Sequence, residues 1–155
     1  MLVTYEFIPK VANMNKPTIN SSSIAQSGVD NSMRYQAGLE KLTRIDGEAG
    51  AAVIEALSDI APDLGKYIIE FAFGDIYCRE GLSLQEREVL TLASLLSLGG
   101  CENQLKVHIH AALNIGISAN KIVEVMLHCI PYVGFPRVLN AVFTTKQIFL
   151  EQDGR

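Results

Sequence analysis

Hydrophobic residues recur three and four positions apart from Met33 onward, in segments joined by short turns that contain Gly or Pro. This spacing places apolar side chains on one face of an α-helix, and no segment shows the strict alternation typical of a half-buried strand. The pattern therefore predicts an all-α domain of about six to seven helices. The expected helices cover residues 32–44, 48–60, 62–79, 84–99, 101–115, 119–132 and 135–151.

The first part of the chain differs from this helical body in composition. Its opening 30 residues are rich in Asn, Ser, Thr and Pro, and Thr18 to Asp30 shows no sustained apolar period. Such a segment buries too little apolar surface to form a core of its own. We expect residues 1–31 to be a polar N-terminal arm and residues 32–152 to form a single helical domain.

The segment after Ser83 combines a clear helix start with a strongly apolar helix. Ser83 and Glu86 have the spacing of a capping box, in which each side chain accepts a hydrogen bond from the other residue's backbone N–H. The following apolar residues leave almost no polar face, which predicts burial on all sides. They are Val89, Leu90, Leu92, Ala93, Leu95, Leu96 and Leu98. Because few helices are available to cover this one, and the C-terminal helix is also apolar, we expect a homo-oligomer.

The charge balance narrows the range of partners. The chain has 155 residues, with 13 Lys and Arg against 17 Asp and Glu, and its sequence pI is near 5.3. An acidic chain is unsuited to the phosphate backbone of nucleic acids. The apolar stretch from Val89 to Leu98 is shorter than the ~18 residues that a membrane span needs. No signal peptide and no Gly-rich phosphate motif is recognisable, so we expect a cytoplasmic protein without a cofactor.

Three cysteines, Cys78, Cys101 and Cys129, are too widely spaced for a Cys-x-x-Cys pair or a zinc knuckle, and we expect reduced thiols. Free cysteine is commonly a small buried hydrophobe, and this is the expected role of Cys78 and Cys129. Cys101 lies beside a Gly-Gly turn and stays a candidate for chemistry.

The histidines are His108, His110 and His128, and each is a candidate acid or base because imidazole titrates near neutral pH. His108 and His110 point to roughly opposite sides of one helix, with His108 on its apolar face. Neither has a second ligand at the i+4 position, and Glu124 with His128 is equally typical of a surface pair. We therefore expect no metal site.

Two charged residues stand at unusual positions for a helix. Glu88 leads directly into the apolar stretch, one turn before Leu92, on the side that we expect to be buried. A carboxylate held there needs a partner and becomes a candidate for proton transfer. Arg137 lies in the first turn of a helix, against the preference set by the helix dipole, so we expect an anionic ligand or a carboxylate across an interface to hold it.

Taken together, the sequence resembles the carboxymuconolactone decarboxylase family from about Met33 to Leu150. Several spaced motifs in one order carry the resemblance, and such a series is far more specific than any single motif. The motifs are Phe73-Gly74-Asp75-Ile76-Tyr77, Arg79-Glu80-Gly81-Leu82-Ser83, Glu86-Arg87-Glu88 with Leu90-Thr91-Leu92-Ala93, Gln104-Leu105-Lys106-Val107-His108 with Ala111-Ala112-Leu113-Asn114-Ile115-Gly116, Glu124-Val125, and Tyr132-x-Gly134-x-Pro136 with Asn140-Ala141. The resemblance implies an all-α fold assembled into a ring-like oligomer, a trimer or hexamer, with pockets near subunit contacts.

The family divides into two chemistries. One branch resembles the decarboxylase that removes CO2 from γ-carboxymuconolactone, and the other resembles the AhpD-like component of alkyl hydroperoxide reductase, which uses a Cys-x-x-Cys pair. Cys101 could stand at the first cysteine of that pair, but Gln104 occupies the place of the second, so no intramolecular disulfide can form. A peroxidase would have to use Cys101 alone with an external thiol, and Glu102 beside it disfavours a thiolate.

The decarboxylase branch fits better, and it implies a cofactor-free reaction on a small carboxylate or lactone substrate. Loss of CO2 leaves an enolate, which must be stabilised and then protonated on carbon. We expect His108 to be the hydrogen-bond donor or general acid and Glu88 to orient it. Arg87 or Arg137 would hold a second carboxylate of the substrate, and Tyr132 is also expected to bind substrate.

Three functions stay open on this basis: a decarboxylase with an altered substrate, a thiol-dependent peroxidase that uses Cys101, and a non-catalytic oligomeric binding protein. A decarboxylase should depend on His108 and tolerate Cys101→Ser, whereas a peroxidase should show the reverse.

Overall fold

The computed structural model describes residues 30–153, and these contain helices and turns without a strand. The elements are α1 (Asp30–Leu57), α2 (Pro62–Tyr67), the π-helix η1 (Ile68–Ile76), α3 (Leu84–Leu98), α4 (Glu102–Asn114), α5 (Ala119–His128), α6 (Ile130–Val133) and α7 (Phe135–Asp153). The predicted all-α class is confirmed for this part of the chain. The predicted arm lies outside the described residues, apart from its last two residues, which belong to α1.

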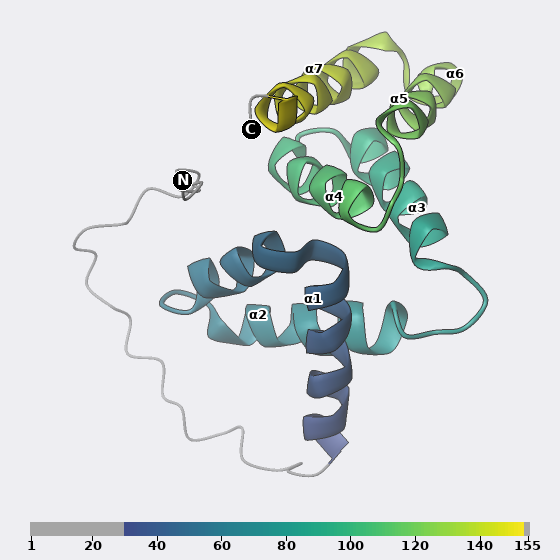
Figure 1. The fold of residues 1–155 in the computed structure, drawn as a ribbon. Coiled ribbons are helices and arrows are strands. Elements are labelled where there is room, and N and C mark those ends of the chain that lie inside the picture. Colours follow the sequence, from purple (N-terminus) through teal and green to yellow (C-terminus); the bar gives the residue numbers. More distant parts are fainter. Residues whose placement is uncertain (1–29, 154–155) are drawn as a thin grey trace.

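The first two predicted helices appear as two consecutive segments of α1. They meet at Gly47, whose φ of 55° lies in the left-handed region that glycine adopts without a steric penalty. Figure 1 shows the bend at this point, where the chain turns to run back over α2 and η1. The predicted break between residues 44 and 48 is therefore confirmed as a sharp change of direction.

Two predicted helices differ from the structure. The segment 62–79 begins as α2 but continues as a π-helix, with the N–H of Tyr77 bonded to the carbonyl of Ala72 five residues earlier. The segment 119–132 is interrupted at Cys129, so that Pro131 falls in the first turn of the short α6. Proline lacks a backbone N–H and is tolerated in a first turn, which explains the new start. Hydrophobic spacing alone reveals neither change.

Figure 1 shows α1, α2 and η1 on one side of the molecule and α3 to α7 on the other. Each side has its own apolar cluster. Leu42, Ile45, Ile69 and Phe73 pack with Ala111 of α4, whereas the larger cluster lies among α3, α4, α5 and α7. Since Ile109 and Ala112 of the same helix belong to the larger cluster, α4 joins the two halves. Glu88, His108 and Tyr77 form a polar cluster at this junction.

The burial of individual side chains in the single chain bears on several expectations. Helix α3 was expected to be covered partly by another subunit, and within its own chain Leu90 is 54% exposed and Leu98 67% exposed. Cys129 is buried as expected, but Cys78 is exposed because it lies in the turn that follows η1. None of the described helices combines the length and apolar character needed to cross a bilayer.

Helix α1 crosses η1 with direct contact between backbones. A Cβ atom added to Gly38 would overlap the carbonyl oxygen of Ile69, and one added to Gly74 would lie 2.7 Å from the carbonyl oxygen of Arg34. Side chains at these positions would force the two helices apart. Glycine at both positions therefore sets the distance between α1 and η1.

Gly38→Ala should lower the free energy of unfolding by about 1–3 kcal/mol, because the added methyl group meets backbone that cannot rotate away. Urea denaturation followed by circular dichroism measures the change. Gly65→Ala is the matched control, because its Cβ would lie at an ordinary 3.4 Å from Ile54 and alanine is the better helix former. Equal or greater stability of Gly38→Ala would contradict the close crossing.

Candidate active site

Glu88 is the central residue of a buried polar cluster at the junction of the two halves. Its side chain has no exposed surface, although it lies in the first half of α3. Its Oε1 accepts a hydrogen bond from the hydroxyl of Tyr77 at 2.8 Å, and its Oε2 lies 2.9 Å from Nδ1 of His108. The expectation that Glu88 is buried and needs a partner is confirmed, and it has two partners, one just after the end of η1 and one on α4.

The tautomer of His108 follows from this contact. An ionised carboxylate only accepts hydrogen bonds, so Nδ1 carries the hydrogen and donates it to Glu88. The proton that His108 gains or loses is then carried on Nε2. The His108 side chain keeps 21% of its surface exposed, so the ring can meet a small molecule.

The surroundings of His108 favour its charged form. Burial alone would lower the pKa of the imidazole, but the hydrogen bond to Glu88 and the negative charges of Glu88 and Asp46 outweigh it, so the pKa is raised. A raised pKa increases the fraction of imidazolium at any given pH, which favours a role as a general acid.

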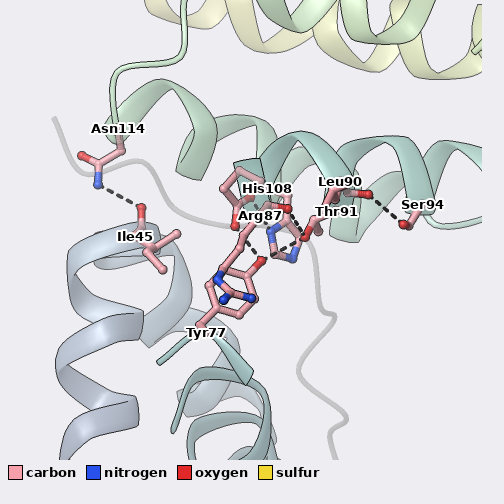
Figure 2. A network of polar contacts seen from close by, with 9 residues as sticks. Ile45, Tyr77, Arg87, Leu90, Thr91, Ser94, His108 and Asn114 are labelled. Atoms are coloured by element: carbon pink, nitrogen blue, oxygen red, sulfur yellow. Dashed lines mark hydrogen bonds and ion pairs between the residues drawn. The ribbon is translucent and has the colours of Figure 1, made fainter. Parts of the chain in front are cut away.

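Tyr77 supports the cluster from the other side. Its hydroxyl oxygen lies 2.9 Å from Oγ1 of Thr91, and Figure 2 shows the ring pointing toward His108 and Thr91. Burial and then the charge of Glu88 raise the pKa of Tyr77 far above its usual range, so the hydroxyl stays a neutral donor. Because the hydroxyl stays neutral, it donates a hydrogen bond to Glu88 without placing a second negative charge beside the carboxylate.

Asp46 completes the group of ionisable side chains. It lies just before the bend in α1 and is 8% exposed. Burial, opposed by the charge of His108 and reinforced by that of Glu88, raises the pKa of its carboxyl group to about 6. No hydrogen-bond partner reaches its Oδ1 among the described residues.

Arg87 brings positive charge to the same region. It is 9% exposed, its guanidinium group donates to the carbonyl oxygen of Arg79, and the group lies 5.9 Å from the centre of the Tyr77 ring. Its Nε is buried and finds no partner in the described part of the chain. An unused buried donor on a cation is suited to an anionic ligand.

The cluster also has the spacing of a cation site. One oxygen of Asp46, one oxygen of Glu88 and one ring nitrogen of His108 lie within 4.8 Å of one another. The search of the sequence for metal ligands spaced along one helix did not find this group, because the three side chains come from α1, α3 and α4. Both oxygens of Glu88 already accept hydrogen bonds, so a cation would have to displace or share these donors.

The other predicted site residues lie elsewhere in the single chain. Cys101 and Arg137 line a small cleft at the far end of α3 and α4, together with Gly99 and Leu105. The guanidinium of Arg137 donates to the carbonyl of Ser97, near the C-terminus of α3, where the helix dipole favours a cation. Within its own chain, Arg137 therefore has a carbonyl partner at the C-terminus of α3.

Cys101 and Tyr132 are also separate from the cluster. The thiol of Cys101 donates to the carbonyl of Gly99 at 3.6 Å, and Cys101 begins α4 whereas His108 lies two turns later. Tyr132 is 75% exposed, with its ring 5.7 Å from the ring of His128. Of the six predicted site residues, the chain brings together Glu88, His108 and Arg87.

Sequence reasoning missed the roles of Tyr77 and Asp46. Tyr77 belongs to one of the family motifs, but the π-helix that positions it could not be foreseen. Asp46 had a usable signal: it lies four residues after Leu42, next to Ile45 and three before Ala49, all of them buried. A carboxylate on the apolar face of a helix indicates a special environment.

Comparisons with known proteins identify relatives of this chain. A model of the carboxymuconolactone decarboxylase family matches residues 62–147. A 4-carboxymuconolactone decarboxylase of Acinetobacter baylyi is 34% identical over 122 residues, which cover 78% of this chain and 90% of that protein. A nitrosuccinic acid decarboxylase of Metarhizium robertsii is 31% identical over 80 residues, which cover 52% and 55% of the two chains. An uncharacterized 15.0 kDa protein of Paracoccus denitrificans is 26% identical over 101 residues, 64% of this chain and 75% of that one.

Glu88→Gln should lower the pKa of His108, because the substitution removes both the charge-assisted hydrogen bond and the negative charge that favour the imidazolium. Titration of the histidine ring protons by NMR measures the change. His128, on α5 and beside Tyr132, supplies a reference in the same spectra. A His108 midpoint that stays the same or rises in Glu88→Gln would contradict the arrangement.

Proposed function

This chain belongs to the carboxymuconolactone decarboxylase family, and on that premise we propose that it is a cofactor-free decarboxylase of a small unsaturated lactone acid, with His108 as the proton donor. Two of its relatives are named as decarboxylases, and the first of them aligns over most of both chains. The observation that carries the proposal is the contact between buried Glu88 and the ring of His108. The pKa of His108 is raised, and 21% of its side-chain surface is exposed.

The reaction requires a group that accepts and then quenches negative charge. As the C–C bond to the carboxylate breaks, its electron pair moves into the unsaturated lactone and CO2 leaves. The imidazolium of His108 stabilises the enolate by a hydrogen bond from Nε2 and then transfers that proton to carbon. The hydrogen bond between Nδ1 and Glu88 stabilises the charged ring while the substrate is bound.

Arg87 fits a role in binding a second carboxylate of the substrate. Its buried Nε has no partner, and it contacts the ring of Tyr77, which bonds to Glu88. A tight grip on the departing carboxylate would stabilise the ground state and oppose the reaction. A carboxylate that remains in the product gains from the same contact without this penalty, so Arg87 favours a dicarboxylate substrate.

We also propose that the active form is a homo-oligomer, a ring-like trimer or hexamer. Helix α7 packs on the core through one face, yet large apolar side chains on its opposite face are exposed. They are Phe135 (66%), Leu139 (48%), Phe143 (60%) and Leu150 (62%). Leu90 and Leu98 of α3 are exposed as well, and a row of exposed apolar side chains along one helix face, such as that of α7, is typical of a contact with another subunit.

His108→Ala should lower kcat for CO2 release by about 10²- to 10⁴-fold, the usual contribution of a positioned general acid. Release of CO2 from 4-carboxymuconolactone and from a series of related lactone acids measures the activity. His110→Gln removes a histidine from the opposite side of the same helix and should retain activity, as should Cys101→Ser. Full activity of His108→Ala, or loss in Cys101→Ser alone, would reject the proposed mechanism.

Phe143→Glu should reduce the native mass toward that of one 16.9 kDa chain, because a charge at a buried apolar contact is strongly unfavourable. Light scattering after size exclusion measures the mass. Asn120→Glu adds the same charge at an exposed position of α5 and is the control. A wild-type chain that is already monomeric would contradict the oligomer.

A further inference from the structure

Asp46 is a buried acid that no contact in the described structure explains. It is 8% exposed, yet its Oδ1 has no hydrogen-bond partner. A carboxylate oxygen buried without a donor is unfavourable, and native proteins rarely keep one without a reason. Glu88, by contrast, uses both oxygens. A purely structural role would give Asp46 partners of the same kind.

The place of Asp46 points to proton chemistry. Its carboxyl group lies in the cluster whose three closest ligand atoms, from Asp46, Glu88 and His108, are within 4.8 Å of one another. The ionisable groups that face it are Tyr77 from the end of η1, Glu88 from α3 and His108 from α4. Tyr77 is a neutral donor committed to Glu88, and Glu88 is committed to two donors. His108 is then the group in this set with which Asp46 can exchange a proton.

We propose that Asp46 is a positioning residue that acts through His108, stabilising the imidazolium as a carboxylate and returning a proton to the ring as a carboxylic acid. The inference rests on the proposed function, in which His108 gives its proton to carbon in each turnover. Asp46 then takes up a proton from solvent and passes it through one bridging water to Nε2 of the neutral His108, which restores the carboxylate beside the imidazolium. One substrate carboxylate and one solvent proton become CO2 and product, so the cycle is balanced.

The electrostatics of the cluster agree with this direction of transfer. The pKa of Asp46 is about 6, because burial and Glu88 raise it more than His108 lowers it. The pKa of His108 is raised above its own usual value, partly by the charge of Asp46. Transfer from Asp46 to neutral His108 therefore runs toward the stronger base.

The decisive experiment compares wild type, Asp46→Asn and Glu48→Gln by NMR titration of the His108 ring in the full chain. Glu48→Gln removes the same charge two residues away, from an exposed position on α1. The proposal expects a lower His108 pKa in Asp46→Asn and little change in Glu48→Gln. Equal shifts in the two variants, or no shift in Asp46→Asn, would overturn it. This measurement needs no substrate. The proposal for Asp46 can therefore be rejected even if CO2 release still depends on His108.

A second readout uses the pH dependence of thermal unfolding. The folded-state pKa of Asp46 lies above the ordinary value near 3.8, so its ionisation destabilises the fold as pH rises through about 6. Asp46→Asn should therefore raise Tm relative to wild type at pH 8, and this gain should shrink as the pH falls toward 4. A pH-independent difference in Tm would show a structural role and overturn the proposal.

Activity separates the two parts of the inference. Asp46→Asn should lower kcat about tenfold or more and shift the pH profile of kcat, whereas KM changes little because Asp46 acts through His108. An unchanged pH profile would overturn the role in proton return.

Addition of Mn²⁺ to the wild-type protein tests whether the cluster of Asp46, Glu88 and His108 binds a cation instead. Stoichiometric broadening of the His108 signals would assign the Asp46 oxygen to a cation and overturn the proposal.

Discussion

The hydrogen bonds that Glu88 accepts from Tyr77 and His108 are the constraint around which the two halves of the molecule are organised. A carboxylate without exposed surface is tolerated only with donors on its oxygens, and leaving it unpaired would cost several kcal/mol, on the order of the whole stability margin of a small domain. The donors come from the residue that follows η1 and from α4, and Glu88 itself comes from α3. The same contacts that satisfy the buried charge therefore fix the relative positions of three helices and the tautomer of the imidazole.

The irregular parts of the backbone lie close to this cluster. The π-helix η1 ends at the residue before Tyr77, and its wider turn changes the direction in which that side chain leaves the helix. The contact of α1 with η1 depends on Gly38 and Gly74, which allow the two backbones to touch. Gly47 then bends α1 immediately after Asp46. The π-turn, the glycine contacts and the bend at Gly47 are each less favourable than a regular helix with larger side chains. Together they bring Asp46 and Tyr77 to the polar cluster around Glu88.

Two buried polar atoms near the site have no partner in the described chain, Oδ1 of Asp46 and Nε of Arg87. One is an acceptor and the other a donor, and neither contributes to stability in the free protein. Unsatisfied groups of opposite character beside a raised-pKa imidazole are typical of a site that stays incomplete until a ligand arrives. In the proposed function, the stability given up at Asp46 and Arg87 is recovered in substrate binding and proton transfer, the usual trade between stability and activity.

The sequence determined the helical class, most helix positions, the capping box at Ser83 and the burial of Glu88, because these depend on residues within a few positions of one another. It also placed His108 on the inner face of its helix. Only the tertiary structure decided which of the charged residues meet. It brought Tyr77 and His108 to Glu88, left Arg137 at the far end of α3, and added Asp46 from a helix much earlier in the chain. Periodicity fixes the face of a helix that is buried, but the partner across the junction depends on how the helices cross, and here that crossing follows from glycine contacts and a π-turn that no local pattern reveals.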